Sequence, residues 1–253
     1  MKVANDTKKR QKRGEGTGVD YQPWIRAREF TRDVGIRSLV IDWKTGRQVH
    51  LLSLNEVHWY YQLRWQDNVI DIREQFPLEK ETTDYIAEHL NVKKPEDVMT
   101  TDMLVTYMDK NGIERIKAYS VKNAQEDVFG EIDSQNKQRR IELLRIEMSY
   151  WRLKNAAYEI VFGDKQINAV FADNIAVVVD MYNPMKVVSK QDFLCFLVAR
   201  KYLSIPTMES ERLDFPALTE KYVGTLELRK KWIQKIAETS KIELPDTITT
   251  LNS

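Results

Sequence analysis

The chain has 253 residues, a length that allows one large domain or two modest ones. It is 42% hydrophobic and 30% charged, so it can bury a core and remain soluble. A formal net charge of +1 excludes a generic polyanion-binding protein. No signal-peptide pattern follows Met1 and no apolar run approaches a bilayer-spanning length, so we expect a cytoplasmic protein.

Cysteine and histidine are too sparse to support a disulfide framework or a zinc site. The single cysteine, Cys195, lies in an apolar run, so we expect a small core residue in a reducing compartment. The three histidines form no Cys/His ligand pattern and no HExxH motif; they are His50, His58 and His89.

The N-terminus is unusually basic, with one acidic residue, Asp6, among six basic ones: Lys2, Lys8, Lys9, Arg10, Lys12 and Arg13. Glycines follow, so we expect residues 1–20 to form a flexible basic arm. Two interpretations stay open, a solubilising tail and a contact with DNA or a partner.

The next part of the chain mixes helical and extended patterns. We expect, in order, a short helix over 24–31, a strand over 34–42, an extended segment over 49–52, a helix over 53–66, a strand over 69–76 and a helix over 82–90. Pro77 ends the second strand.

A β-hairpin is the clearest local prediction. The β-rich runs 103–108 and 113–121 flank Asn111-Gly112, the strongest short hairpin signal. A hairpin centred on this pair places Asp102 nearly opposite Val121 and Lys122, about 4.5–5.5 Å across the ladder. Side chains alternate along a strand, so Ser120 and Lys122 share a face.

A long helix is expected over 126–154, with Leu143, Ile146, Met148 and Trp151 on its apolar face, and a buried strand over 157–162. The fold class predicted for residues 21–167 is therefore mixed α/β.

Residues 168–253 are expected to form a smaller, mainly helical domain. Pro184, Pro206 and Pro216 mark breaks or loops, and helices are expected over 189–202 and 222–240. A winged-helix or helix-turn-helix module and a helical module that packs on a partner are both open.

Glu56, Asp102 and Lys122 fit one active site. Two carboxylates supply hard oxygen ligands for Mg²⁺, and a lysine stabilises developing negative charge. This is the chemistry of metal-dependent phosphodiester hydrolysis. Each residue also has a structural explanation: Ser53-x-x-Glu56 is a capping box, Asp102 is an ordinary loop residue, and Lys122 can protect a sheet edge.

Two further groups are candidates for nucleic-acid contacts. Three basic residues of the long helix could face phosphate, although Glu142 and Glu147 make a solvated face equally credible; they are Lys137, Arg139 and Arg140. Three aromatic residues are expected to be core rather than a base-stacking platform; they are Tyr60, Tyr61 and Trp65.

The sequence resembles the TnsA family, the endonuclease subunits of Tn-seven-like heteromeric transposases. The resemblance is carried by residues 56–65, by Ile-Arg-Glu-Gln-Phe-Pro-Leu within 69–78, by Thr101-Asp102, by Ser120-Val121-Lys122 and by residues 147–151. It covers about residues 35–174 and is much weaker beyond them.

This resemblance implies a restriction-endonuclease-like catalytic core and a winged-helix-like C-terminal domain. It assigns Glu56, Asp102 and the Val121 carbonyl as ligands of Mg²⁺, with Mn²⁺ as a substitute, and Lys122 as the catalytic lysine. The implied activity is cleavage of the 5′ strands of double-stranded DNA at transposon ends, at the bacterial nucleoid. The implied partners are the transposase TnsB and the ATPase regulator TnsC.

One position departs from the family pattern. Ser120 stands where such cores carry Asp, Glu or Gln, and serine is shorter and uncharged. An alternative function is therefore a non-catalytic assembly factor with a degenerate nuclease core that bridges TnsB and TnsC. A stand-alone restriction enzyme is a third and weaker candidate.

Overall fold

The structure is a computed structural model that describes residues 3–29, 37–131, 134–240, 242–245, 248 and 251. The chain forms two compact units, Met1–Ile167 and Asn168–Ser253. The first contains every strand of the described residues, and the second contains helices and 3-10 turns. The structure is therefore mixed α/β, with an N-terminal sheet and a helical C-terminal region.

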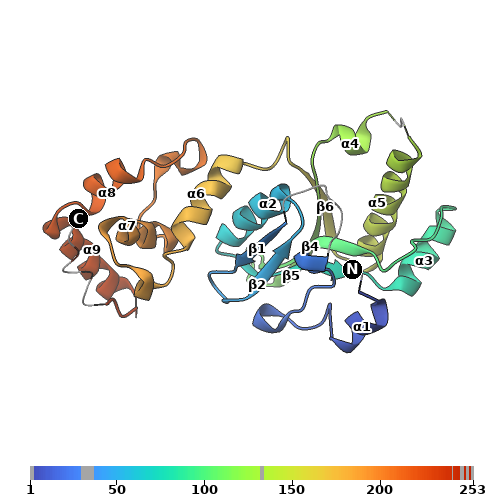
Figure 1. Ribbon diagram of the computed structural model, residues 1–253, viewed down its shortest axis with the longest axis horizontal. Coiled ribbons are helices and arrows are strands. Elements are labelled where there is room, and N and C mark those ends of the chain that lie inside the picture. The colour runs from blue at the N-terminus through green and yellow to red at the C-terminus, as the bar shows by residue number, and fades with distance from the viewer. Residues whose placement is uncertain are drawn as a thin grey trace. The chain divides into compact units, whose positions relative to one another are not determined.

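A four-stranded sheet is the centre of the first unit (Figure 1). Its strands, in spatial order, are β3 (Val69–Pro77), β4 (Thr100–Met108), β5 (Glu114–Lys122) and β6 (Ala157–Phe162). The first three are mutually antiparallel, and β6 runs parallel to β5. A parallel neighbour requires a crossover connection, which is supplied here by α5 (Gln135–Leu153).

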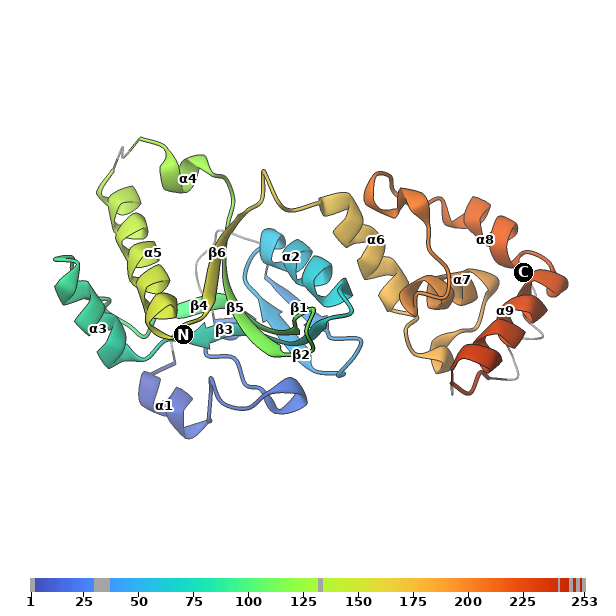
Figure 2. The same ribbon diagram turned by 180° about the vertical axis from the view of Figure 1, so that it is seen from behind.

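Both faces of this sheet are covered. Helix α2 (Leu54–Trp65) and the two-stranded sheet of β1 (Ser38–Ile41) and β2 (Gln48–Leu51) lie on one face, and α3 (Lys80–His89) and α5 lie on the other (Figure 2). Alternation along β4 explains this: Met103 and Val105 pack beneath α2, whereas Leu104 packs beneath α5.

The predicted hairpin is present, with a different turn from the one expected. Met108 pairs with Glu114 and Met103 with Tyr119, so the loop holds three residues between Asp109 and Ile113. Gly112 alone in this loop has a positive φ, +73°, whereas a two-residue turn on Asn-Gly needs two such residues. The register therefore brings Asp102 opposite Ser120 instead of Val121 or Lys122.

The long helix expected over 126–154 is two helices. Helix α4 spans Glu126–Phe129 and ends at Gly130, whose extended backbone (φ −73°, ψ 178°) leaves the helical region. Ser134 then caps α5 by accepting a hydrogen bond from the Lys137 amide. Met148, expected on the apolar face of the helix, is half exposed.

The expectation of a flexible N-terminal arm is wrong for residues 3–20. Helix α1 spans Asn5–Arg10, and the buried Arg13 forms an ion pair with Glu29 at 2.6 Å. The same guanidinium donates to the Trp24 carbonyl, and Lys8 is buried over the Trp24 ring. Partners further along the chain thus neutralise or cover these charges, which composition alone does not reveal.

Two other predictions in this region are met only in part. In place of a helix over 24–31 there is a 3-10 turn, η2 (Ala27–Glu29), and residues 30–31 lie outside the described residues. The strand expected over 34–42 is β1, and its first predicted positions also lie outside them.

The second unit contains α6 (Ala169–Val179), η3 (Pro184–Lys186), α7 (Lys190–Ala199), η4 (Pro206–Glu209), α8 (Phe215–Val223) and α9 (Leu226–Thr239). Residues 193–199 of α7, including Cys195, are all buried, as befits a central helix. Pro216 lies in the first turn of α8, which begins at Phe215, rather than in a loop. The helix expected over 222–240 is broken at Gly224, and Thr225 caps α9.

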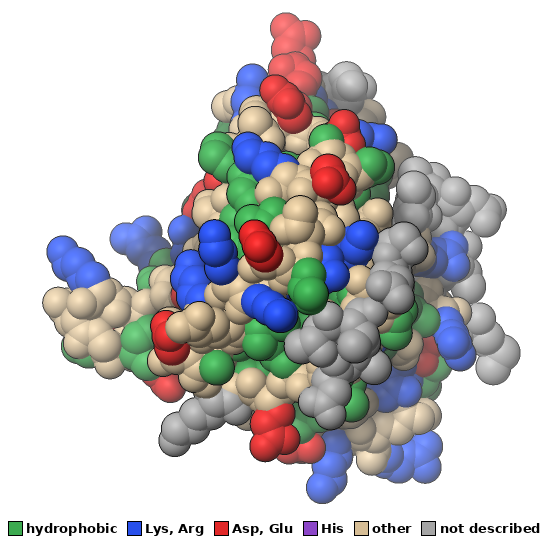
Figure 3. Space-filling view, turned by 90° about the vertical axis from the view of Figure 1, so that its left-hand side faces the viewer, with side chains coloured by type: hydrophobic (Ala, Val, Ile, Leu, Met, Phe, Trp, Pro, Cys, Tyr) green, Lys and Arg blue, Asp and Glu red, His purple; other side chains and the backbone are tan. Residues whose placement is uncertain are grey.

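Charge on the second unit is mixed. On the face that Figure 3 shows, Lys and Arg side chains are interspersed with Asp and Glu. In the basic run on α9, Arg229 is buried and donates to the carbonyls of Val223 and Gly224. Among the described helices of the whole chain, none is long and apolar enough to cross a membrane.

Candidate active site

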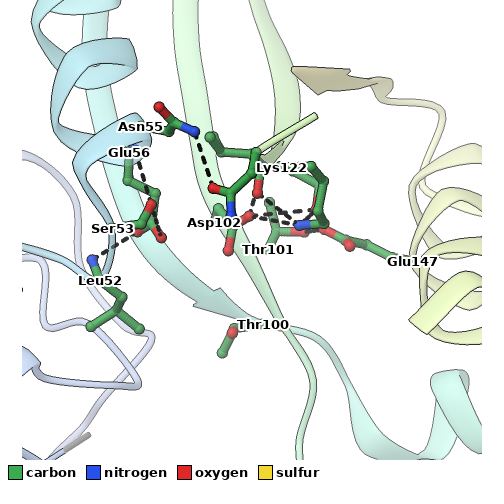
Figure 4. A network of polar contacts seen from close by, with 12 residues as sticks. Leu52, Ser53, Asn55, Glu56, Thr100, Thr101, Asp102, Lys122 and Glu147 are labelled. Carbon is green, nitrogen blue, oxygen red and sulfur yellow. Dashed lines mark hydrogen bonds and ion pairs between the residues drawn. The ribbon is translucent and has the colours of Figure 1, made fainter. Parts of the chain in front are cut away.

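The end of the β4–β5 hairpin brings together three of the predicted site residues. One carboxylate oxygen of Asp102, Oδ2, accepts hydrogen bonds from the Val121 amide at 2.7 Å and from Ser120 Oγ at 3.4 Å. Lys122 Nζ lies 3.3 Å from the same oxygen. The predicted proximity of Asp102 and Lys122 is therefore observed (Figure 4).

The Lys122 ammonium is surrounded by oxygen atoms. Besides Asp102 it contacts Ser120 Oγ at 2.7 Å and the Val121 carbonyl at 3.0 Å. Burial lowers the pKa of Lys122, but Asp102 and Glu147 more than offset this, so its pKa is raised above the ordinary value. The lysine is a permanent cation at neutral pH, and the expected shared face of Ser120 and Lys122 is confirmed.

Glu56 lies on the other side of the same space, in the first turn of α2 (Figure 4). Its carboxylate accepts hydrogen bonds from the Leu52 amide at 3.0 Å, from Ser53 Oγ at 3.1 Å and from Gln75 Nε2 at 3.3 Å. Burial, followed by the charge of Asp102, raises the pKa of Glu56 to about 8.

The capping-box explanation of Glu56 proves compatible with a site role. Ser53 Oγ accepts a hydrogen bond from the Glu56 amide, as an N-cap does. The Glu56 carboxylate reaches back to the Leu52 amide instead of the Ser53 amide. The cap therefore fixes Glu56 at the start of α2, with its side chain buried and directed toward Asp102.

Glu147 is the functional candidate that sequence reasoning missed, because it was placed on a solvated face. It is 4% exposed and accepts a hydrogen bond from Thr101 Oγ1 at 2.7 Å. Burial, with a contribution from Asp102, raises its pKa to about 7. A signal was present: Glu147 follows Leu144 by three residues and precedes Trp151 by four, the spacing of the apolar face.

The three basic residues proposed for DNA contact have different environments. Lys137 is buried. Arg139 donates to the carbonyls of Lys93 and Lys94 and forms an ion pair with Glu142. Arg140 is exposed and lines a cleft.

The expected core role of the aromatic group holds for Tyr60, which is fully buried and donates a hydrogen bond to Asp42. Tyr61 stacks on Trp43 with ring centroids 5.9 Å apart.

A cleft of about 840 Å³ joins these groups within the first unit. Glu56, Asp102, Ser120, Lys122 and Glu147 all line it. The N-terminal segment forms another part of its wall through Asn5, Lys8 and Trp24. Carboxylates with raised pKa values that share a cleft with a lysine are typical of a catalytic or ion-binding site.

The donor atoms fit a hard divalent cation. The described residues contain no cluster of three or more His, Cys, Asp or Glu side chains arranged to hold a metal. Mg²⁺ does not need one, because it binds through one or two carboxylates and retains several waters. The oxygens of Asp102, Val121 and Ser120 already converge on one cation, the Lys122 ammonium.

Comparison with known proteins agrees with this chemistry. The family model described as "TnsA-like endonuclease N terminal" matches residues 66–163, which include the four-stranded sheet, Asp102, Lys122 and Glu147. Residues 66–163 therefore match a TnsA-like endonuclease domain, in line with the resemblance.

A particular relative is "Transposon Tn7 transposition protein TnsA" of Escherichia coli. It is 37% identical over 168 residues, and the alignment covers 64% of this chain and 57% of the relative. The chain thus spans little more than half the length of this curated relative.

Proposed function

We propose that this chain is the metal-dependent DNA endonuclease subunit of a heteromeric transposase, and that it cleaves the 5′ strands at transposon ends during cut-and-paste transposition. The observation that carries the proposal is the cleft in which Glu56, Asp102 and Lys122 meet. Residues 21–167 form the catalytic domain in this proposal, with a restriction-endonuclease-like core, and residues 168–253 form a winged-helix-like domain.

Each side chain has a role in the proposal. Glu56, Asp102 and the Val121 carbonyl would hold Mg²⁺ or Mn²⁺, which would polarise the phosphate and activate a water. Lys122 stabilises the negative charge that develops on the phosphate. Ser120, which donates to Asp102 and accepts from Lys122, holds both in place. Arg140 is proposed to contact the DNA backbone at the edge of the cleft.

The proposal includes partners, because a chain with a net charge of +1 has little nonspecific affinity for DNA. A TnsB-type transposase would recognise the transposon ends and cut and join the 3′ strands. A TnsC-type ATPase would license both reactions. The Escherichia coli relative is named as a transposition protein, which supports this setting.

The test is a strand-specific cleavage assay with both partner proteins and labelled transposon ends. Lys122→Ala should abolish cutting of the 5′ strand and leave joining of the 3′ strand intact, so that simple insertions become cointegrates. The matched control is Lys117→Ala on the same strand, where Lys117 pairs with Glu159. An unchanged product distribution for Lys122→Ala contradicts the assignment.

Ser120 favours one alternative, a non-catalytic assembly factor that bridges the transposase and the ATPase. In that case, cointegrates would form with the wild-type chain, and Lys122→Ala would change nothing. A stand-alone nuclease would instead cut DNA without partners. The same assay, run with and without the two partner proteins, distinguishes the three functions.

A further inference from the structure

The backbone of Gln75 departs from the rest of its strand. Its φ is +49°, in the left-handed region that residues other than Gly, Asn and Asp rarely adopt. Glu74 and Gln75 are consecutive and both buried, so the alternation of β3 is broken here. Strained backbone of this kind clusters at functional sites, where the surroundings enforce it.

The N-terminal segment holds the Gln75 backbone in this conformation through two hydrogen bonds. The Gln75 carbonyl accepts a hydrogen bond from the Trp24 amide at 3.2 Å. The preceding carbonyl, of Glu74, accepts one from the Tyr21 hydroxyl at 2.9 Å. Two residues of the segment that lines the cleft therefore hold the backbone on both sides of the Gln75 α-carbon.

The consequence is that the Gln75 side chain enters the cleft, where it is 2% exposed. Its Nε2 donates to Glu56 Oε2 at 3.3 Å, and its Oε1 accepts from Thr100 Oγ1 at 3.1 Å. Because the amide oxygen accepts from Thr100, the amide presents its Nε2 donor to Glu56.

Gln75 is also beside the other carboxylate. The pairs Glu74 with Met103 and Phe76 with Thr101 flank it, so its backbone faces Asp102 across the ladder. The residue thus lies between the two side chains proposed to share a cation, and it belongs to the Ile-Arg-Glu-Gln-Phe-Pro-Leu run.

We propose that Gln75 is a positioning residue, which holds the Glu56 carboxylate in the orientation in which Glu56 and Asp102 bind one divalent cation. This inference rests on the proposed function and adds a residue to it. Removing a side chain that hydrogen-bonds to a metal ligand typically lowers metal affinity by about 10–100-fold. A residue with only a backbone role would have no such effect.

The experiment measures Mg²⁺ and Mn²⁺ dissociation constants by calorimetry on the full chain, with thermal denaturation to confirm folding. Gln75→Gly keeps the left-handed backbone accessible but removes the amide, and it should weaken binding about tenfold or more. The matched control is Asn155→Gly, at an exposed residue with a φ of +53°, and it should bind as the wild type does.

Thr100→Val supplies the second readout. It removes the hydroxyl that orients the amide, so it should weaken cation binding by itself and have no further effect in a Gln75→Gly background. If Gln75→Gly does not fold, Thr100→Val tests the positioning role alone. An unchanged cation affinity of Thr100→Val then overturns the inference.

The outcomes separate this inference from the proposed function. A wild-type chain that binds neither cation overturns both. Normal binding by the wild type and equal binding by folded Gln75→Gly overturns the positioning role alone. Full additivity of the Thr100 and Gln75 effects overturns it as well.

Discussion

Two kinds of buried carboxylate occur in the first unit. Glu74 forms an ion pair with Arg47 at 2.7 Å, and Asp42 forms one with Arg64 at 2.8 Å. Glu56 and Glu147 are as deeply buried, but no described cation lies within ion-pair distance of either. Their hydrogen-bond donors are neutral amides and hydroxyls.

This difference separates residues that support the fold from residues available for chemistry. A carboxylate that is paired with an arginine has its charge neutralised within the protein. Burial raises the pKa of Glu56 and Glu147, but it also raises the pKa of Glu74. The ion pair with an arginine, and not the pKa, therefore distinguishes the two kinds. Only the second kind lies beside Asp102 and Lys122 in the cleft.

The largest expected effect is on catalysis. Asp102→Asn removes a negative charge that Lys122 and the proposed cation share, so 5′-strand cleavage should fall about 10³-fold. Asp109→Asn, at the other end of the same hairpin, is the control and should cleave normally, because an amide can retain its turn contacts. Single-turnover cleavage kinetics measure both, and comparable losses in the two variants would contradict the site.

The second prediction concerns the paired carboxylates. Arg47→Leu leaves the fully buried Glu74 without its partner and should lower the free energy of unfolding by about 3–5 kcal/mol, as measured by urea denaturation. The double variant Arg47→Leu/Glu74→Leu should recover much of this loss. A small effect of the single variant would show that the ion pair does not stabilise the fold.

The third prediction concerns pH, in the presence of a chelator. Because Glu56 has a pKa of about 8 in the folded chain against 4.5 ordinarily, the native state retains a proton that the unfolded state releases between these values. The free energy of unfolding should therefore fall as pH rises from about 5 to about 8, by an amount on the order of 3 kcal/mol from this group.

Glu56→Gln cannot ionise and should reduce that slope, whereas Glu81→Gln, at an exposed glutamate of α3, should retain it. Glu147→Gln should reduce the slope below about pH 7. Urea denaturation across this pH range provides the measurement, and identical slopes for Glu56→Gln and the wild type would contradict the raised pKa.

The smallest expected effect comes from Thr101. Its hydroxyl is fully buried, donates to Glu147 and accepts from the Trp151 indole at 2.7 Å. Thr101→Val should cost about 1–2 kcal/mol of unfolding free energy, since it removes a buried hydrogen bond from each of these two groups. Thr106→Val on the same strand, where the hydroxyl accepts a bond from Arg73, serves as the less buried control. If both variants lose the same unfolding free energy, burial of Thr101 does not increase the contribution of its hydrogen bonds.

Sequence reasoning located the hairpin, because the turn signal and two β-rich runs are local features. The register of the hairpin could not be predicted from the sequence in the same way. Asn111-Gly112 allows more than one loop length, and only tertiary packing selects among them. Asp102 and Lys122 still met, because the Asp102 carboxylate reaches along the strand end to the Val121 amide.

Long-range partners account for most of what could not be predicted. The charge of Arg13 predicts an exposed arm, but in the structure Glu29 and the Trp24 carbonyl bind this side chain. Glu147 was read as a surface residue because a glutamate on a helix usually is, and its burial depends on Thr101 and on the sheet. The left-handed backbone of Gln75 has no sequence signal at all.

Anomalous diffraction from crystals soaked in Mn²⁺ tests the central claim most directly, because it locates the cation. The proposed function predicts one strong peak in the cleft, about 2 Å from carboxylate oxygens of Glu56 and Asp102. It also predicts that this peak disappears in Asp102→Asn. A cleft without a peak in the wild-type chain, or a peak that persists unchanged in Asp102→Asn, would contradict the claim that the unpaired carboxylates form a metal site.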